Sequence, residues 1–332
     1  MKSLLLTKFS KIFFNALDVA EVPPPQISDG CATVRMAAAA LNPADLHIAS
    51  GEMKMFSPKR PPFALGVDGA GIVISDGKHF KTGDRVMFYT GLVHCGTLAE
   101  QMSVPEDWLA PVPTSWTDAE AAAAPLALLV AFKALERTKA KKGESILVSG
   151  AGGPVGAATI ALAKYRGLNV YGLGSPDDEA YVKSLGAETF ASYRSPSTSL
   201  PLKSFDILLD CFGGKTMDLA CKLVKPGGRI VSLKAMTGIE DMEAQGMRIP
   251  FIIKLLIPII FRRARKAAER SNAKLIGLAS YPDGTALSKV AQEAVSAGFR
   301  PRIDTEFTLL DYKSAFERLG SHPRGKVIVK LA

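Results

Sequence analysis

A cluster of glycines interrupts the middle of the chain, between an apolar segment and an alanine-rich one. The turn reads G-x-G-G-P-V-G and consists of Gly150, Gly152, Gly153, Pro154, Val155 and Gly156. If a helix begins there, its first backbone amides lack partners within the helix and its dipole is positive, which favours a bound pyrophosphate. Glycines let such a ligand approach the backbone. The spacing departs from the strict G-x-G-x-x-G pattern, so a tight turn with a purely structural role is the alternative to a dinucleotide site.

A second group of polar residues lies at the end of the next apolar segment. An NAD site usually has Asp or Glu at this point to bind the ribose 2′-hydroxyl, whereas this chain has Gly174 and Ser175. A missing carboxylate leaves room for a 2′-phosphate, to which Ser175 could donate a hydrogen bond and over which Tyr193 and Arg194 could close. The alternative for Ser175 is that it only caps a helix, and both roles can hold together.

The elements that must position these residues follow from the apolar pattern of the middle of the chain. Apolar segments predicted to be strands alternate there with predicted helices. These strands are expected at Ser145–Gly150, Asn169–Gly174, Phe205–Phe212 and Arg229–Met236. Near-continuous apolar strands that alternate with helices predict a parallel sheet covered on both faces, in a doubly wound α/β domain. The glycine turn then lies at a crossover from a strand to a helix.

The first third of the chain has a different texture, with short extended segments broken by Gly and Pro. Strands are predicted at Cys31–Ala40, Gly69–Ser75 and Asp84–Thr90. The last segment, 301–332, has two strand-like ends around one amphipathic helix and is too small to fold alone, so it is expected to complete the first domain. The predicted division is a β-rich domain of residues 1–118 and 283–332 and a nucleotide-binding domain of residues 119–282.

The composition is that of a folded protein with large cores. Of the 332 residues, 47% are hydrophobic and 22% are charged, and a chain of this length is expected to form two domains. The four cysteines are far apart and form no metal-ligand pair, which favours reduced thiols in the cytosol. The apolar run Leu4–Leu6 is cut by Lys8, so no export signal is predicted and a cytoplasmic location is expected.

The net charge of +9 raises the question of an acidic partner, and much of the excess lies in one place. The basic segment Phe261–Lys274 follows the apolar segment Ile249–Ile260, which is too short to cross a bilayer. The favoured interpretation is a helix pair that covers an apolar cleft. The second is an interfacial segment that touches anionic lipid, giving peripheral membrane contact through 249–270. Nucleic acid is the weakest interpretation, because no aromatic residues are interleaved with the basic ones, and no nucleic-acid partner is expected.

With these residues in view, the chain resembles the medium-chain dehydrogenase/reductase superfamily, and within it the zinc-free quinone oxidoreductase branch that includes zeta-crystallin. The resemblance extends over nearly the whole length. It rests on the segments LNPADLHIASG, FALGVDGAGIV, KTGDRV, AAAAPLALLVAFKAL, ILVSGAGGPVGAATIALAK, SLGAE, FDILLDCFGG, LVKPGGRIVSL and RGKVIVKL. It implies an α/β fold with a GroES-like β-rich catalytic domain, a Rossmann nucleotide-binding domain, and hydride transfer in the cleft between them.

The same resemblance indicates a chain without catalytic zinc. Zinc members of the superfamily have a ligand Cys and a ligand His where this chain has Asn42 and Val67, and Asp68 replaces the Glu that follows. A tetrahedral zinc site needs three or four N or S ligands. Without a Lewis acid, reduction of a polarised C=C bond or a quinone is favoured over alcohol oxidation. The expected substrate is therefore a small lipophilic carbonyl compound or quinone, and the expected hydride donor is NADPH.

The resemblance also implies roles for three polar residues of the β-rich domain. Asn42 is the candidate donor that orients the substrate carbonyl. His47 stands where many relatives have Tyr, and its ordinary pKa of about 6.5 suits proton donation near neutrality. The alternative for His47 is a structural histidine with satisfied hydrogen bonds. Tyr89, at the end of a predicted strand, either lines the nicotinamide pocket or is an ordinary strand end.

Three features depart from the pattern of the family. Val130 replaces a Thr that often lies near the nicotinamide carboxamide. Asp178 replaces a Lys that often faces the 2′-phosphate, and Lys183 is the residue that could compensate; NADPH stays preferred over NADH. The third departure is the segment Ile249–Arg270, which replaces a short connection and is expected near the carboxyl edge of the sheet, as a lid or a contact for a lipophilic substrate.

Two other functions and an oligomeric state complete the expectations. An enoyl-thioester reductase is the second enzymatic hypothesis, with Arg262 and Arg263 available to a phosphopantetheine or carrier-protein partner. A non-catalytic nucleotide-binding protein is the third hypothesis. Homodimers are common in the superfamily and often form through edge strands of the nucleotide domain, so a homodimer is expected, paired near Arg229–Met236 or near Ala273–Tyr281.

Overall fold

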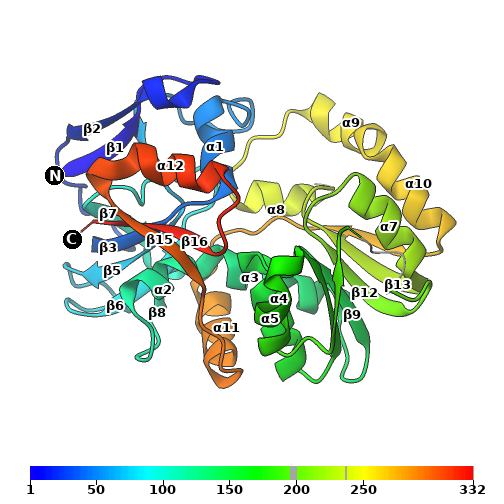
Figure 1. Ribbon diagram of the computed structural model, residues 1–332. Coiled ribbons are helices and arrows are strands. Elements are labelled where there is room, and N and C mark those ends of the chain that lie inside the picture. Colours follow the sequence, from blue (N-terminus) through cyan, green and yellow to red (C-terminus); the bar gives the residue numbers. More distant parts are fainter. Residues whose placement is uncertain (195–199, 236–237, 332) are drawn as a thin grey trace.

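The computed structural model describes residues 1–194, 200–235 and 238–331. The chain forms two halves, each built around its own sheet, and both termini belong to the same half (Figure 1). The first half contains the blue, cyan and red parts of the chain, and the second contains the green, yellow and orange parts (Figure 1).

The first half is rich in β-structure. Its main sheet has seven strands in the order β15-β16-β3-β5-β6-β8, with β7 paired to β3, and a small sheet has the order β2-β1-β4. The strands are β1 (Lys2–Leu6), β2 (Leu17–Glu21), β3 (Cys31–Ala40), β4 (Phe63–Ala64), β5 (Asp68–Val73), β6 (Arg85–Tyr89), β7 (Gln101–Pro105), β8 (Ala110–Pro111), β15 (Ile303–Thr308) and β16 (Lys326–Lys330). The helices here are α1 (Pro43–Ser50), α2 (Asp118–Ala123) and α12 (Tyr312–Gly320).

The end of the chain lies beside its beginning in this sheet. Strand β16 pairs antiparallel with β3, with Ile328 opposite Ala40, and β15 pairs parallel with β16. The returning strands bring Lys326 next to the segment that follows β3, and they place the loop 321–325 beside the second half. The helix before them, α11 (Gly284–Ser296), contacts α3 and α4 of the second half as well as β8. The domain bounds expected from the sequence stay a prediction.

The second half is a doubly wound parallel sheet. Its six strands have the order β11-β10-β9-β12-β13-β14, and every pairing is parallel. The strands are β9 (Ser145–Ser149), β10 (Asn169–Gly174), β11 (Thr189–Ser192), β12 (Phe205–Asp210), β13 (Val224–Ser232) and β14 (Lys274–Gly277). Its helices are α3 (Pro125–Thr138), α4 (Pro154–Tyr165), α5 (Glu179–Ser184), α7 (Lys215–Leu223), α8 (Ile239–Ala244), α9 (Phe251–Ile260) and α10 (Arg262–Arg270). The expected strand at 229–236 ends earlier, at Ser232, and Met236 lies outside the described residues.

Burial on both faces of this sheet explains its apolar strands. Within β9, Ile146 and Val148 pack in the core under α3 and α4, while Leu147 packs in a second core with residues of α7 and α10. Successive side chains of a strand point to opposite faces, so a strand covered on both sides must be apolar throughout. The predicted fold class, an α/β Rossmann domain beside a GroES-like β-rich domain, is confirmed.

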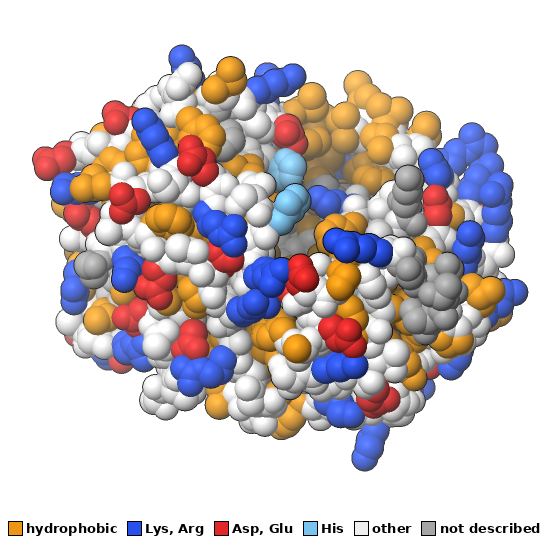
Figure 2. Space-filling view, viewed as in Figure 1, with side chains coloured by type: hydrophobic (Ala, Val, Ile, Leu, Met, Phe, Trp, Pro, Cys, Tyr) orange, Lys and Arg blue, Asp and Glu red, His pale blue; other side chains and the backbone are white. Residues whose placement is uncertain are grey.

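A hollow separates the two halves on the face shown in Figure 2. Helices α8, α9 and α10 lie on the second half, and α9 faces α1 across the hollow (Figure 1). A small apolar core joins the segment 239–253 to the first half: Met242 and Met247 pack there with Val93 and Phe56. None of the helices in the described part of the chain has the length and apolarity that a membrane crossing requires.

Candidate active site in the cleft

The glycine turn joins β9 to α4, as the sequence predicts, and two of its glycines are sterically required. Gly150 has φ +81°, in the left-handed region that favours glycine. A Cβ atom on Gly156 would lie 2.1 Å from the carbonyl oxygen of Gly150, so any side chain there would force the turn open. Gly153 is freer, since a Cβ on it would meet only that same oxygen, at 3.4 Å.

Several backbone amides of the turn are available to a ligand. Pro154 is the first residue of α4 and has no N–H group. Among the described residues, no hydrogen bond uses the amide of Gly152, Val155 or Gly156, although the amide of Gly153 donates to Gly150 O at 3.0 Å. Free amides and a positive dipole at the start of a twelve-residue helix fit a phosphate group. Because Gly156 has no side chain, the phosphate can come close to the backbone.

Asp178 lies against this turn. A Cβ atom on Gly152 would come 2.3 Å from Oδ2 of Asp178, so the carboxylate packs directly over that glycine. Arg302, at the start of the returning strands of the other half, pairs with Asp178 at 3.4 Å, and Arg324 pairs with the neighbouring Asp177 at 2.6 Å. The cations that face the acidic pair are therefore these two arginines. Lys183 instead pairs with Glu179 at 2.6 Å.

The other predicted nucleotide residues gather at the carboxyl edge of β10 and β11. Gly174 is in register with Ser192, and the amide of Tyr193 donates to Gly174 O at 3.1 Å. Ser175 follows Gly174 and occupies the cap position of a short 3₁₀ helix, but its side chain makes no capping hydrogen bond. Arg194 is exposed and its amide donates to Ser192 Oγ.

Tyr193 also borders the glycine turn. Its ring packs edge-on against Phe212, with 5.7 Å between ring centroids, and a Cβ on Gly150 would touch the Phe212 ring at 3.1 Å. Burial raises the pKa of Tyr193 above its usual range, and the amide of Gly150 partly offsets this. The structure thus brings Gly150, Ser175 and Tyr193 to one edge of the sheet.

In the first half, Asn42 belongs to a buried polar cluster. Asn42 precedes α1, and its Nδ2 donates to Asp68 Oδ2 at 3.0 Å and to Ala40 O at 3.2 Å. Lys326 Nζ donates to Asn42 Oδ1 and, at 2.8 Å, to Asp68 Oδ2. The second oxygen of Asp68 accepts the amide of Leu126 at the start of α3, where a negative charge is favoured by the helix dipole.

Asp45 completes this cluster with an unusual protonation equilibrium. Its Oδ2 accepts the Asn42 amide at 2.8 Å, while its Oδ1 is buried without a hydrogen-bond partner among the described residues. Burial, reinforced by the negative charge of Asp68, raises the pKa of Asp45 to about 7. When Asp45 is protonated, Asp68 and Lys326 are the only charged side chains of the cluster, and their charges cancel.

The remaining predicted catalytic residues occupy different surroundings. Tyr89 is buried at the end of β6, and its hydroxyl donates to Gln245 Oε1 at 3.3 Å, across the boundary between the halves. Burial raises the pKa of Tyr89 well above its usual range. His47 lies in the last turn of α1 with its side chain about half exposed, and its Nδ1 lies 2.7 Å from Glu52. No hydrogen bond among the described residues joins His47 to the Asn42 cluster.

Comparison with known proteins agrees with this geometry. Residues 28–114 match the alcohol dehydrogenase GroES-like domain, and residues 185–329 match the zinc-binding dehydrogenase family. An NADPH-dependent alkenal/one oxidoreductase from Arabidopsis thaliana is 34% identical over 63% of this chain and 56% of that relative. The chain thus covers little more than half of that relative. A chloroplast envelope quinone oxidoreductase homologue from the same plant is 30% identical over 64% of this chain and 68% of its own length.

The chain belongs to the quinone oxidoreductase branch of the medium-chain dehydrogenases/reductases. Among solved structures, the quinone oxidoreductase from Thermus thermophilus, also determined as a complex with NADPH, superimposes with a TM-score of 0.75. It is 26% identical and covers 99% of this chain and 100% of its own. The predicted resemblance is confirmed, and the comparisons support a nicotinamide cofactor.

Membership of this branch gives meaning to the residues at the zinc positions of the superfamily. Asn42 is fully engaged with protein partners, and Val67 is a buried aliphatic residue that offers no ligand atom. Within the residues that the structure describes, no group of three or more His, Cys, Asp or Glu side chains is placed to hold a metal ion.

Several polar residues of the cleft in this member of the quinone oxidoreductase branch could not be identified from the sequence. Gln245 accepts from Tyr89 and, at 3.3 Å, from the Leu92 amide. Asp241 forms a bidentate pair with Arg137 and accepts the Ala279 amide. No spacing motif links these residues, because each pair joins segments far apart in the chain.

Lys326 and Lys133 were missed as well. Lys326 lies in RGKVIVKL, one of the segments on which the family resemblance rests. The sequence indicated the segment but no role for Lys326. Lys133 lies on α3 with its Nζ 2.8 Å from the ring centroid of Tyr281 and 3.2 Å from Tyr281 O. Burial lowers the pKa of Lys133 to about 7.

Proposed function

We propose that this protein reduces a quinone or an α,β-unsaturated carbonyl compound with NADPH, by hydride transfer and without zinc. The observation that carries the proposal is the glycine turn, whose free amides fit a pyrophosphate. The names of the relatives, an NADPH-dependent alkenal/one oxidoreductase and a quinone oxidoreductase, support the same reaction class.

The chain's own residues would bind and orient the cofactor at the carboxyl edge of the sheet. The amides of Val155 and Gly156 would bind the pyrophosphate, beside Gly150, Gly152 and Gly153. Ser175, Tyr193 and Arg194 would contact the adenosine ribose and its phosphate, with Lys183 at the outer rim. The bound nicotinamide supplies the hydride.

Preference for NADPH over NADH is the finer part of this proposal. Arg302 and Arg324 bring two positive charges to Asp177 and Asp178, in the place where a lysine of relatives would stand. A 2′-phosphate would compete with these carboxylates for the arginines. We expect Arg324→Gln to weaken NADPH binding by roughly tenfold and to leave NADH binding unchanged, measured by fluorescence titration. Equal effects on both cofactors would contradict this role.

On the substrate side, the buried cluster fixes Asn42 in one orientation. Both hydrogens of Asn42 Nδ2 already have acceptors, so its donation to a substrate oxygen would replace the bond to Ala40 O. The Tyr89 hydroxyl stays protonated near neutral pH, and burial raises its pKa further. Its one hydrogen is donated to Gln245 Oε1, so donation to a substrate oxygen would replace that bond. His47, beside Glu52 and open to solvent, is the proposed proton donor.

Activity is tested with purified full-length protein. We expect NADPH to bind, and a quinone and an enal each to cause loss of reduced-nicotinamide absorbance that a zinc chelator does not slow. His47→Gln should lower the rate most at the pH where proton donation limits turnover, with His79→Gln, at an exposed position away from this site, as its matched control. Failure of both nicotinamide cofactors to bind at micromolar concentration would overturn the proposal, and turnover of an enoyl-CoA alone would assign the enoyl-thioester reaction instead.

A homodimer is the proposed assembly, and the structure corrects one part of the expected pairing. Strand β13 is bordered on both sides, by β12 and β14, so Arg229–Ser232 offers no free edge for a partner. Strand β14 is the edge of the sheet, which leaves Lys274–Gly277 as the proposed pairing strand. Light scattering on the purified protein measures the mass directly. Peripheral membrane contact through 249–270 and a cytoplasmic location also stay proposals.

A further inference from the structure

Helix α9 presents an apolar face to solvent. Six large hydrophobic side chains on it are between 39% and 72% exposed. They are Phe251, Ile252, Leu255, Leu256, Ile259 and Ile260. Their spacing, two adjacent positions in each turn, places them on one continuous side of the helix. Surface helices of soluble proteins normally carry polar residues on the side that faces solvent, whereas the solvent-facing side of α9 is apolar.

The polar and protein-facing residues of α9 lie on its other side. Ile257 is buried, and Ile253 packs against the small core that joins the segment to the first half. Lys254 is the one charged residue of the helix, and its Nζ is held at 2.5 Å by Glu243. The helix is therefore fixed to the protein by its inner side, while its outer side is largely exposed to solvent.

Helix α10 follows directly and is strongly basic. Its exposed cations are Arg262, Arg263, Arg265, Lys266 and Arg270. Arg263 pairs with Asp218 at 2.9 Å, and Arg265 lies 4.0 Å from Glu269. Arg262, Lys266 and Arg270 recur every four residues and have no ion pair among the described residues. Figure 2 shows the apolar side chains gathered over α9 and the basic ones beside them over α10.

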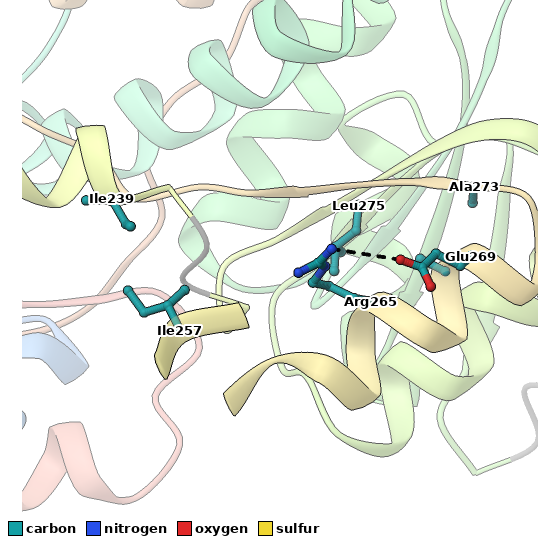
Figure 3. A pocket seen from close by; sticks show the side chains of 7 residues that line it. Ile239, Ile257, Arg265, Glu269, Ala273 and Leu275 are labelled. Carbon is teal, nitrogen blue, oxygen red and sulfur yellow. Dashed lines mark ion pairs between the residues drawn. The ribbon is translucent and has the colours of Figure 1, made fainter. Parts of the chain in front are cut away.

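A pocket of mixed polarity lies beneath the junction of these two helices. It has a volume of about 370 Å³ and is lined by Ile239, Ile257, Arg265, Ala268, Glu269, Ala273 and Leu275. Figure 3 shows Ile239 and Ile257 apart from the Arg265–Glu269 pair, which comes from the neighbouring helix. None of the residues of the Asn42 cluster lines it, so it is separate from the cleft chemistry.

We infer that α9 and α10 form a docking surface for an anionic lipid bilayer, with the outer face of α9 inserted among the acyl chains and Arg262, Lys266 and Arg270 against the headgroups. An apolar face flanked by unpaired cations is complementary to such a surface in both charge and polarity. A second copy of this chain fits less well, because a symmetric contact through α9 would bring two α10 helices together, each with five exposed cations. The inference refines the proposed membrane contact through 249–270.

Vesicle sedimentation of the full chain tests the inference without substrate or cofactor, so its outcome is independent of the oxidoreductase assay. The wild-type protein is compared on phosphatidylcholine vesicles and on vesicles that also contain phosphatidylglycerol. The apolar-face variant carries Ile252→Ser, Leu255→Ser and Ile259→Ser. Its matched control changes three exposed apolar residues elsewhere to Ser: Ile27, Leu202 and Leu310.

A charge series separates the role of the cations from that of net charge. The cation variant carries Arg262→Gln, Lys266→Gln and Arg270→Gln. Its control changes Lys141, Lys142 and Lys203 to Gln, which lowers the net charge equally. Each neutralised cation is expected to weaken partition by about fivefold, so the cation variant should bind anionic vesicles about a hundredfold more weakly.

We expect the wild type and both controls to bind the anionic vesicles, less so at high salt, and the apolar-face variant to lose roughly tenfold or more of that binding. Circular dichroism verifies that each variant is folded. Wild-type protein that stays in the supernatant with anionic vesicles would overturn the inference, as would equal binding by the apolar-face variant and its control. A dimer that dissociates in the apolar-face variant would also overturn it, by assigning the face to a second copy.

Discussion

Replacement of Asp45 by asparagine tests the charge balance of the buried cluster next to Asn42. Asp45 has a pKa of about 7 in the folded protein against an ordinary value of 3.8, chiefly because burial disfavours its charged form. Asparagine keeps an oxygen that can accept the Asn42 amide, as Asp45 Oδ2 does at 2.8 Å, but cannot ionise. The variant therefore isolates the free-energy cost of ionising this side chain.

The sign of the effect follows from the two pKa values. Between pH 4 and pH 7 the unfolded chain has lost the Asp45 proton while the folded protein keeps it, so the folded state binds more protons and loses stability as pH rises. The loss levels off above pH 7, where Asp45 ionises in both states. The stability of Asp45→Asn relative to wild type should rise by about 4 kcal/mol between pH 4 and pH 8, since each pKa unit corresponds to about 1.4 kcal/mol.

Tryptophan fluorescence during urea unfolding measures this difference in the half of the molecule that contains Asp45. The chain has two tryptophans, Trp108 and Trp116, and both belong to the segment before α2; Trp116 is buried in the core that includes α1 residues. Asp18→Asn, at an exposed position of β2, is the control and should show no comparable trend. A difference between Asp45→Asn and wild type that stays constant within about 1 kcal/mol from pH 4 to pH 8 would refute a raised pKa for Asp45.

Three further outcomes follow from the same geometry. Lys326→Met should cost about 3–5 kcal/mol in urea unfolding because it leaves Asp68 charged and buried, and the double variant with Asp68→Asn should lose less than the sum of the two single changes. Gly156→Ala should abolish NADPH binding in a fluorescence titration because its Cβ would lie 2.1 Å from a backbone oxygen, whereas Gly153→Ala, with its nearest neighbour at 3.4 Å, should bind normally. Burial lowers the pKa of Lys133 to about 7, so between pH 9 and pH 7 the unfolded chain is already protonated at this residue while most of the folded protein is not. Stability therefore falls as pH drops from 9 to 7, and Lys133→Met should gain about 2 kcal/mol over wild type across this interval in the same urea assay.

The nucleotide half could be predicted from the sequence because its signals are local. Apolar strands such as Ser145–Ser149 are buried on both faces, and the glycine turn follows its strand directly. Periodicity and turn chemistry therefore predict both the sheet and the place of the phosphate site. Strand boundaries do not follow from such local signals: β13 begins at Val224 and passes through Pro226, a residue that normally argues against a strand.

The cleft could be predicted only in part because its contacts join distant segments. Lys326 meets Asn42 across 284 positions of the chain, and Gln245 meets Tyr89 across 156. No periodicity or spacing connects such residues, since the antiparallel pairing of β16 with β3 and the path of the segment after β13 decide which side chains meet. Asp178 departs from the family pattern, and the positive charge that pairs with it belongs to Arg302. The nearby Lys183, which the sequence suggested for this role, pairs with Glu179 instead.

The segment between β13 and β14 shows why hydropathy alone left its role open. Its apolar residues serve two opposite sides: Met242, Met247 and Ile249 pack inward against Val93, next to the hydrogen bond from Tyr89 to Gln245, whereas the outer face of α9 remains in solvent. A sequence of isoleucines and leucines cannot indicate which of them is buried, because both sides are equally apolar. Only five residues separate Gln245 from the start of α9, so the chain that closes one end of the cleft also anchors the exposed helix, and the inner contacts fix the direction in which its outer face points.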